Sequence, residues 1–231
     1  MIQISNLIKK YGETVIFSNL NYTFENTCIY GLVGRNGAGK TTLLNILSNY
    51  DKNYTGVISI DGEKMNKVDY LDMPVAYAMD QPSFFNELTI YENLLLIASS
   101  RKIKKQEAFD KIERILDGLG LKKYENYSPL ELSKGTMQRL NNACAMIQEE
   151  KITIFDEPFS GLDPVQMKLL ENVIVEFHKK EKGIYIISSH DIECLQNVCD
   201  KCLLLHNGQI REINMEEVDR EEIAKILSEG E

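Results

Sequence analysis

Apolar and polar residues alternate near the start of the chain, as they do in half-exposed strands. Residues 2–4 and 20–24 show this alternation, with every second side chain apolar. Residues 56–60 run into Asp61 and Gly62, a pair typical of a hairpin turn. Together these segments predict an antiparallel sheet in the N-terminal part of the chain.

Further along, the apolar spacing predicts buried strands and helices instead. Continuous apolar runs, typical of strands in a parallel sheet, occupy residues 28–33, 75–79, 152–155 and 184–187. Helical spacing fills residues 164–180, which gives a βαβ unit, and it also fills residues 89–148. Thr89 and Glu92 form a capping-box pattern at the start of the second stretch. We predict an α/β fold with a mostly parallel sheet, an N-terminal antiparallel β subdomain and a helical subdomain inserted at roughly 89–148.

The composition limits the classes of function that fit this pattern. The chain has 231 residues without a linker or repeat, so we expect a single domain over residues 1–231. Its net charge of −9 argues against a nucleic-acid surface, which needs basic residues. No apolar run approaches the roughly 20 residues that cross a bilayer, and no secretory signal is evident. We expect a cytoplasmic protein whose role at a membrane would depend on a partner.

Five cysteines, an odd number, suit a reducing compartment better than a disulfide framework. Cys194, Cys199 and Cys202 have the spacing of part of an iron–sulfur ligand set, but Cys28 and Cys144 lie far away in sequence. Cys194 and Cys199 also fall on a stretch that looks helical. We interpret all of them as small buried residues.

The clearest chemical motif follows the apolar run 28–33. Residues 34–41 fit the phosphate-binding loop G-x-x-x-x-G-K-[ST], and residues 43–47 continue with helical spacing. Lys40 is expected to reach the β- and γ-phosphates, and Thr41 to bind Mg²⁺ through its hydroxyl. Backbone N–H groups at the helix N-terminus add partial positive charge. The residues predicted to cradle a nucleotide are Gly34, Asn36, Gly37, Ala38, Gly39, Lys40, Thr41 and Thr42.

Two carboxylates end the apolar run 152–155. Asp156 suits a Mg²⁺-side acceptor, directly or through water, and Glu157 suits a general base that polarises an attacking water. A solvated turn would explain an isolated Asp-Glu pair. In a chain that also has a phosphate-binding loop, a catalytic pair is a better explanation than a solvated turn.

With these motifs in order, the sequence resembles the ATP-binding subunits of ABC transporters over nearly the whole chain. The resemblance implies that Tyr11 stacks on adenine. It implies that Gln81 joins the catalytic core to the helical insert and senses Mg²⁺ and the γ-phosphate. His190 matches the family's switch histidine, which hydrogen-bonds the γ-phosphate, whereas His178 and His206 match no motif and are expected at the surface.

The family's Leu-Ser-Gly-Gly-Gln signature has its counterpart at residues 132–136. Ser133 and Gly135 match it, while Lys134 and Thr136 depart from it. Ser133 also suits the N-cap of the helix that follows. Residues 160–163 resemble the loop that crosses the dimer interface, which implies that Asp163 lies at the nucleotide site, although Asp163 before Pro164 is also an ordinary helix start.

The resemblance implies ATP hydrolysis, with Mg²⁺, at two composite sites in a head-to-tail pair. Such a pair would be a homodimer or a heterodimer with a second ATPase subunit. A separate integral-membrane permease would hold it at the inner face of the cell membrane. Each site would combine Ser133 and Gly135 of one subunit with Tyr11, Lys40, Thr41, Gln81, Asp156, Glu157 and His190 of the other.

The short C-terminus and the signature are most like those of small subunits of bacterial ABC-2-type exporters, since importer subunits often carry a further regulatory domain. Two alternatives are a soluble ATPase of the same superfamily acting in translation or repair, and a nucleotide-binding regulator without turnover. The first usually has fused ATPase units or coiled-coil insertions, and Glu157 argues against the second. Finally, Phe84 and Phe85 lie among turn formers, so we expect at least one to be exposed and to receive the membrane partner.

Overall fold

The N-terminal part of the chain forms an antiparallel sheet in the computed structural model, which describes residues 1–68 and 72–214. Its strands, in the order β2-β1-β4-β5, are β1 (Ile2–Tyr11), β2 (Thr14–Phe24), β4 (Thr55–Ile60) and β5 (Glu63–Lys64). Asp61 and Gly62, both at positive φ, join β4 to β5. The predicted antiparallel sheet and its hairpin are confirmed.

A second sheet contains all four of the predicted buried runs. Its order is β10-β9-β3-β8-β7-β6, and only the pairing of β10 with β9 is antiparallel. The strands are β3 (Cys28–Val33), β6 (Val75–Ala78), β7 (Ile152–Phe155), β8 (Ile184–Ser189), β9 (Lys201–His206) and β10 (Gln209–Ile213). β6 stops one residue earlier than predicted.

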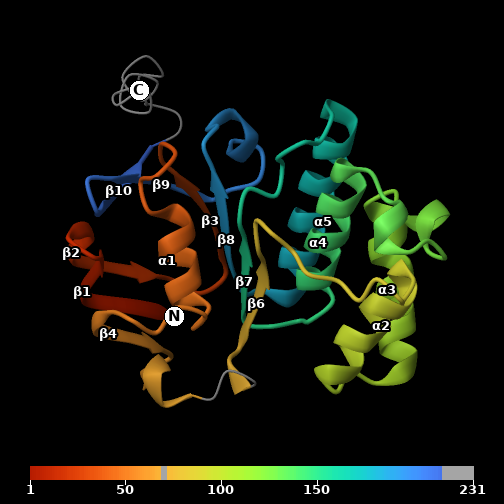
Figure 1. The fold of residues 1–231 in the computed structure, drawn as a ribbon, viewed down its shortest axis with the longest axis horizontal. Helices are drawn as coiled ribbons and strands as arrows, with labels where there is room; N and C mark the ends of the chain where they lie inside the picture. The colour runs from red at the N-terminus through yellow and green to blue at the C-terminus, as the bar shows by residue number, and fades with distance from the viewer. Residues whose placement is uncertain (69–71, 215–231) are drawn as a thin grey trace.

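Helices cover both faces of the second sheet (Figure 1). On one side α1 (Lys40–Leu47) lies between the two sheets. On the other side lie α4 (Lys134–Met146) and α5 (Pro164–Glu181), and outside them α2 (Ile90–Ser100) and α3 (Lys105–Gly118). Thr89 and Glu92 make both hydrogen bonds of the predicted capping box. Single 3₁₀ turns occupy Met65–Lys67, Lys122–Tyr124, Pro129–Glu131 and Glu193–Leu195.

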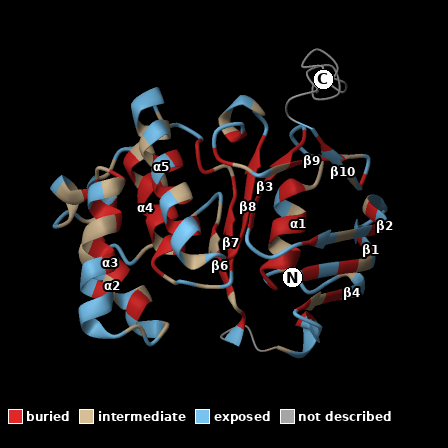
Figure 2. Ribbon diagram, turned by 180° about the vertical axis from the view of Figure 1, so that it is seen from behind, coloured by how far each residue is buried: buried red, intermediate tan, exposed pale blue. Residues whose placement is uncertain are grey.

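The six-stranded sheet separates two hydrophobic cores, and buried residues follow both of its faces (Figure 2). Alternate side chains of one strand enter different cores, because successive residues of a strand point to opposite faces. In β3, for example, Ile29 and Val33 pack with the helices α2 to α5, whereas Tyr30 and Leu32 pack with α1 and the antiparallel sheet. Burial on both faces explains why these strands are continuously apolar.

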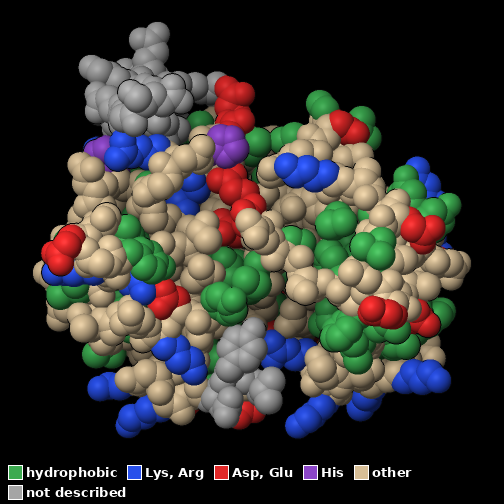
Figure 3. Space-filling model, in the orientation of Figure 1, with side chains coloured by type: hydrophobic (Ala, Val, Ile, Leu, Met, Phe, Trp, Pro, Cys, Tyr) green, Lys and Arg blue, Asp and Glu red, His purple; other side chains and the backbone are tan. Residues whose placement is uncertain are grey.

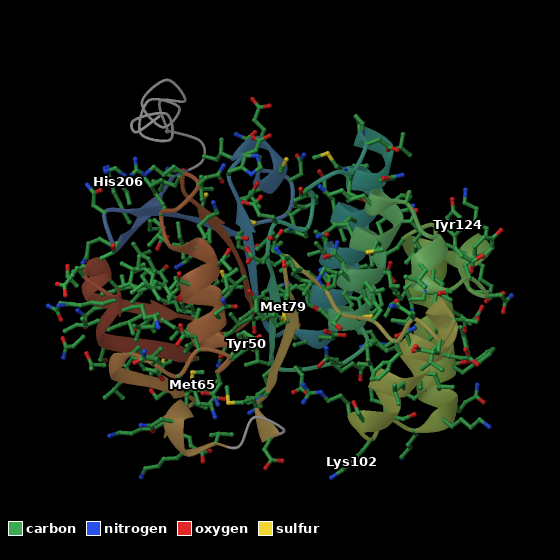
Figure 4. All side chains as sticks on the ribbon, viewed as in Figure 1. Tyr50, Met65, Met79, Lys102, Tyr124 and His206 are labelled. Atoms are coloured by element: carbon green, nitrogen blue, oxygen red, sulfur yellow. The ribbon has the colours of Figure 1, made fainter. Side chains whose placement is uncertain are left out.

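Two expectations about the second half of the chain are wrong. His178 is buried, with Nε2 3.2 Å from the carbonyl of Gly183 and its ring against Tyr185, because the end of α5 folds back onto β8. His206, at the end of β9, is partly exposed (Figure 4). Cys194 lies in the short 3₁₀ turn and Cys199 in no helix, because the chain turns sharply into β9.

In the part of the chain that the structure describes, no helix is both long enough and apolar enough to span a bilayer. The short C-terminal segment that suggested an exporter lies largely outside the described residues.

Candidate active site

The phosphate-binding loop connects β3 to α1, and its shape depends on glycine. Gly37 and Gly39 have φ values of 78° and 101°, which side chains rarely allow. A Cβ on Gly39 would lie 2.8 Å from Cγ2 of Ile16, and one on Gly34 would lie 2.9 Å from the carbonyl oxygen of Leu205. Any larger residue would therefore push the loop away from the strands behind it.

The first turn of α1 leaves its backbone N–H groups open to a ligand. Gly39 is the N-cap and supplies no side-chain hydrogen bond, so the first amides have no acceptor from a cap. Lys40 follows directly and is 6% exposed. Its Nζ donates to the carbonyl of Gly34 at 2.7 Å and lies 3.4 Å from Oε1 of Glu157. Amides, dipole and ammonium all favour an anion here.

Asp156 directly follows β7 as a buried carboxylate, 1% exposed. Its Oδ1 accepts a hydrogen bond of 2.6 Å from Oγ of Ser188, and Oδ2 lies 3.4 Å from the Tyr77 hydroxyl. Burial raises the pKa of Asp156, and hydrogen bonds from Ser188 and Thr41 offset part of this rise. A carboxylate and a hydroxyl side by side are the oxygen donors that suit Mg²⁺, so Thr41 and Asp156 fit that ion.

Glu157 is held in an unusual backbone conformation at the mouth of the site. Its φ is 49°, and its N–H donates to Oγ of Ser188 at 2.8 Å. The carboxylate bridges two basic groups: Oε1 faces Lys40, and Oε2 lies 2.9 Å from Nδ1 of His190. His190 is largely exposed, while Glu157 is mostly buried. This places an oriented carboxylate beside the phosphate-binding loop, as a general base requires.

Beside the loop lies a pocket of about 380 Å³, which Gly34, Ala38 and Asp156 do not line. Most of the residues predicted from the loop, together with Glu157 and His190, line it. The sequence analysis missed Asp80, next to Gln81, and Ser160, at the start of the interface loop, although both adjoin motifs. It also missed Ile16 and Arg35. The lining consists of Ile16, Arg35, Asn36, Gly37, Gly39, Lys40, Thr41, Thr42, Asp80, Glu157, Ser160 and His190.

Tyr11 and Gln81 are not part of the pocket lining. Tyr11 ends β1 and is 51% exposed, with its hydroxyl donating to Asp51 at 3.1 Å and Nζ of Lys9 4.5 Å from its ring centre. Gln81 is exposed and follows the pocket residue Asp80. Their predicted contacts with adenine and Mg²⁺ stay predictions.

The signature residues also lie outside this pocket. Ser133 caps α4 by accepting from the N–H of Thr136 at 3.3 Å, and Asp163 caps α5 by accepting from Gln166 at 2.8 Å, so both predicted caps are confirmed. A Cβ on Gly135 would lie 2.9 Å from the carbonyl oxygen of Gly161, which brings the signature against the interface loop. Within one chain, the signature and the phosphate-binding loop serve different surfaces.

Thr136 points into the molecule. It is buried, its Oγ1 lies 2.9 Å from Oγ of Ser133, and Nη2 of Arg139 donates to it at 3.3 Å. The departure from the signature at Thr136 therefore places a buried hydroxyl at this position rather than a side chain that reaches the surface. That hydroxyl completes the cap of α4.

The surface around the site is strongly polar. In Figure 3, acidic side chains run down the middle of this face, between the half that carries α1 and the half that carries α4. Apolar side chains gather over the helical half. Phe85 is 60% exposed, whereas Phe84 packs against the core, which confirms that at least one of these rings is exposed.

Comparisons with known proteins agree with this geometry. A family model described as ABC transporter matches residues 17–160. The bacitracin transport ATP-binding protein BcrA of Bacillus licheniformis is 33% identical, over 92% of this chain and 69% of its own. The tungstate uptake ATP-binding protein TupC of Peptoclostridium acidaminophilum is 30% identical, over 91% and 97%.

The fold also has a close counterpart among solved structures. The structure of an ATP binding subunit of an ABC transporter superposes with a TM-score of 0.85 at 26% identity, covering 99% of this chain and 95% of that one. The chain therefore belongs to the ABC transporter family, as one of its ATP-binding and ATP-hydrolysing subunits.

Proposed function

We propose that this chain hydrolyses ATP to power a separate integral-membrane permease, and that the permease exports its substrate. The observation that carries the proposal is the position of Glu157, held between Lys40 and His190 at the edge of the pocket. A subunit that only bound nucleotide would not need an oriented carboxylate at that point.

The residues of the pocket divide the work of hydrolysis. Lys40 and the open amides of α1 bind the phosphates, and Glu157 orients the attacking water and accepts its proton. His190 holds the carboxylate of Glu157 and approaches the γ-phosphate from the exposed side. Tyr11 receives the adenine. Thr41, Asp156 and Gln81 would hold Mg²⁺, which when bound neutralises the charge that develops on the phosphates.

A second copy of the chain completes each site. Ser133 and Gly135 are turned away from the pocket of their own chain, so their nucleotide belongs to another subunit. We propose a head-to-tail homodimer in which Asp163 and the interface loop lie between the two nucleotides. A heterodimer with a related ATPase subunit satisfies the same geometry, and mixing differently tagged copies distinguishes the two.

Export is part of the proposal, and the names of two relatives bear on it. The names of BcrA and TupC describe bacitracin transport and tungstate uptake. The signature, which looks like that of small exporter subunits, supports export, whereas the name of BcrA gives no direction of transport. Both relatives are transport subunits, so the alternative of a soluble ATPase in translation or repair is not favoured. The chain would then work at the inner face of the membrane, held there by its permease.

Purification from membranes tests the partner. The tagged chain should bring down one integral-membrane protein in detergent, and Phe85→Ser should lose it without a change in Tm. Phe109→Ser is the matched control, because Phe109 is an exposed ring on α3.

Vesicles test the direction. With the recovered permease, ATP should drive a bacitracin-type peptide into inside-out vesicles. ATP-driven uptake of peptide or tungstate only into right-side-out vesicles would contradict export.

A further inference from the structure

α4 carries a row of amide side chains that face the ends of β6 and β7. Nε2 of Gln138 donates to the carbonyl of Glu157 at 3.3 Å. One turn later, Nδ2 of Asn141 donates to the carbonyl of Met79 at 2.7 Å, and Nδ2 of Asn142 donates to that of Pro158 at 3.2 Å. Met79, labelled near the centre of Figure 4, is the first residue beyond β6.

The geometry of the helix explains how two consecutive residues reach two strands. Neighbouring positions on an α-helix point about 100° apart. β6 and β7 are adjacent and parallel, so their carboxyl ends emerge side by side. Asn141 takes the carbonyl beyond β6, and Asn142 takes the one beyond β7. The N–H of Asp156 already donates to the carbonyl of Ala78 at 2.9 Å, so both strand ends are fixed to each other and to α4.

Helix propensity gives no reason for these two residues. Asn is a weaker helix former than Leu or Ala, and both side chains are buried, at 4% and 0% exposure. Oδ1 of Asn142 has no hydrogen-bond partner among the described residues, which is unfavourable for a buried acceptor. A leucine of similar size would remove that acceptor, but it would also leave the carbonyl of Met79 or Pro158 without the amide donor described above. What the asparagines provide is attachment of the two loops that lead to Gln81 and Glu157.

We propose that Asn141 and Asn142 are positioning residues for ATP hydrolysis. They fix the loops after β6 and β7 to the helix whose N-terminus carries Ser133 and Gly135. Movement of that helix when a partner binds is thereby transmitted to Glu157. This inference rests on the proposed role of Glu157, and both asparagines act through the backbone without touching the nucleotide.

Kinetics with matched stability measurements test the proposal. In Asn141→Leu with Asn142→Leu, we expect kcat for ATP to fall at least tenfold while KM stays within twofold. The Tm of Asn142→Leu should change little, because the variant loses the unsatisfied Oδ1 but also the donor to the carbonyl of Pro158. A residue with only a structural role would lower Tm and leave kcat in place. Met146→Leu, a volume-conserving change in the same helix, is the control.

A second background separates this inference from the proposed function. In Glu157→Gln, adding the two leucines should cost no further turnover, because residues that act through one group are not additive. If Glu157→Gln loses turnover but the folded asparagine variants keep kcat within twofold, only this inference fails. If Glu157→Gln keeps its turnover, the proposed base is wrong and this inference fails with it. Should the leucines prevent folding, Asn141→Ala and Asn142→Ala apply the same criterion.

Discussion

Two helices of this protein begin with a lysine, which is buried in one helix and exposed in the other. α1 starts at Lys40 after Gly39, and α4 starts at Lys134 after Ser133. Lys40 is buried against the phosphate-binding loop, whereas Lys134 is exposed and only its stem lies against Gly161. A helix N-terminus has unpaired amides in both cases, but only Ser133 satisfies one of them with a side chain.

The two helix N-termini therefore differ in what is available to satisfy their amides. The α1 end is left open inside a pocket, so a phosphate can complete it. The α4 end is capped at the surface, where Ser133 shares hydrogen bonds with Thr136 and can meet a ligand held by another chain. In our proposal the open α1 end binds phosphate within the chain, and the capped α4 end meets the nucleotide of a second copy.

The largest expected effect is the loss of ATP turnover when Glu157, beside the α1 end, is replaced. Glu157→Gln keeps the shape of the α1 pocket but cannot accept a proton, so ATP still binds and turnover falls by about 10²–10⁴-fold. The trapped ATP should then draw the α4 end of a second copy onto the pocket. Size measurement with ATP and Mg²⁺ should show a dimer, and turnover at the unchanged rate would remove Glu157 as the base.

Exchanging the two lysines for alanine tests the comparison directly. Lys40→Ala removes a charge-assisted contact with phosphate, and we expect ATP to bind the single chain about 10- to 100-fold more weakly. Lys134→Ala should leave that affinity within twofold. Titration calorimetry at a concentration where the chain is monomeric measures both. Equal losses would mean that the α4 end belongs to the pocket of its own chain.

A smaller effect is expected on the dimer. Lys134→Ala in the Glu157→Gln background should weaken ATP-driven association about threefold, because a positive charge is lost where the partner's triphosphate docks. Thr136→Val should strengthen it by a similar factor, since Ser133 Oγ keeps the cap but its proton no longer has Thr136 Oγ1 as a partner and can point outward. Sedimentation of the two variants decides between them. If neither differs from the parent, these positions do not tune the interface.

The smallest effects concern stability and should have opposite signs at the two ends. Ser133→Ala removes a cap and should cost about 1 kcal/mol, or about 2–4 °C in Tm. Asp156→Asn removes a buried charge from the α1 end and should raise Tm at neutral pH. Because folding raises the pKa of Asp156, the folded state binds that proton more tightly.

The pH dependence provides the control for that last prediction. Charged Asp156 destabilises the fold at neutral pH, and acidification through its raised pKa relieves this cost. The advantage of Asp156→Asn should therefore shrink as the pH falls from about 7 toward 4, the ordinary range of Asp. Melting curves of both proteins across this range measure it, and a gap that widened on acidification would contradict the assignment.

Local pattern was enough to predict much of this fold. The apolar runs became β3, β6, β7 and β8, and the phosphate-binding loop, its lysine and Glu157 met at one pocket, because they follow the carboxyl ends of β3 and β7, two parallel strands with β8 between them. Such residues are brought together by parallel pairing alone. The positions of the apolar runs, and of the motifs that follow them, were therefore enough to predict this arrangement.

What could not be predicted depends on contacts between distant segments. The burial of His178 follows from the return of the chain onto β8, which no local pattern indicates. Ile16 joins the pocket because β2 lies against the loop. Thr136 departs from the signature, and its inward direction follows only from its contacts with Ser133 and Arg139. Asn141 and Asn142 looked like ordinary helix residues until the carbonyls facing them were known.

The topology of the six-stranded sheet has a consequence for synthesis on the ribosome. Among the described residues, β3 pairs with β8 and β9 alone, and these are translated roughly 150 residues after it. At about 5–20 residues per second, the strand that leads into the nucleotide loop waits roughly 10–30 s for its neighbours. During that time its apolar faces and unpaired edges are accessible to chaperones and proteases. The nascent chain is therefore most vulnerable where the finished protein is most completely buried.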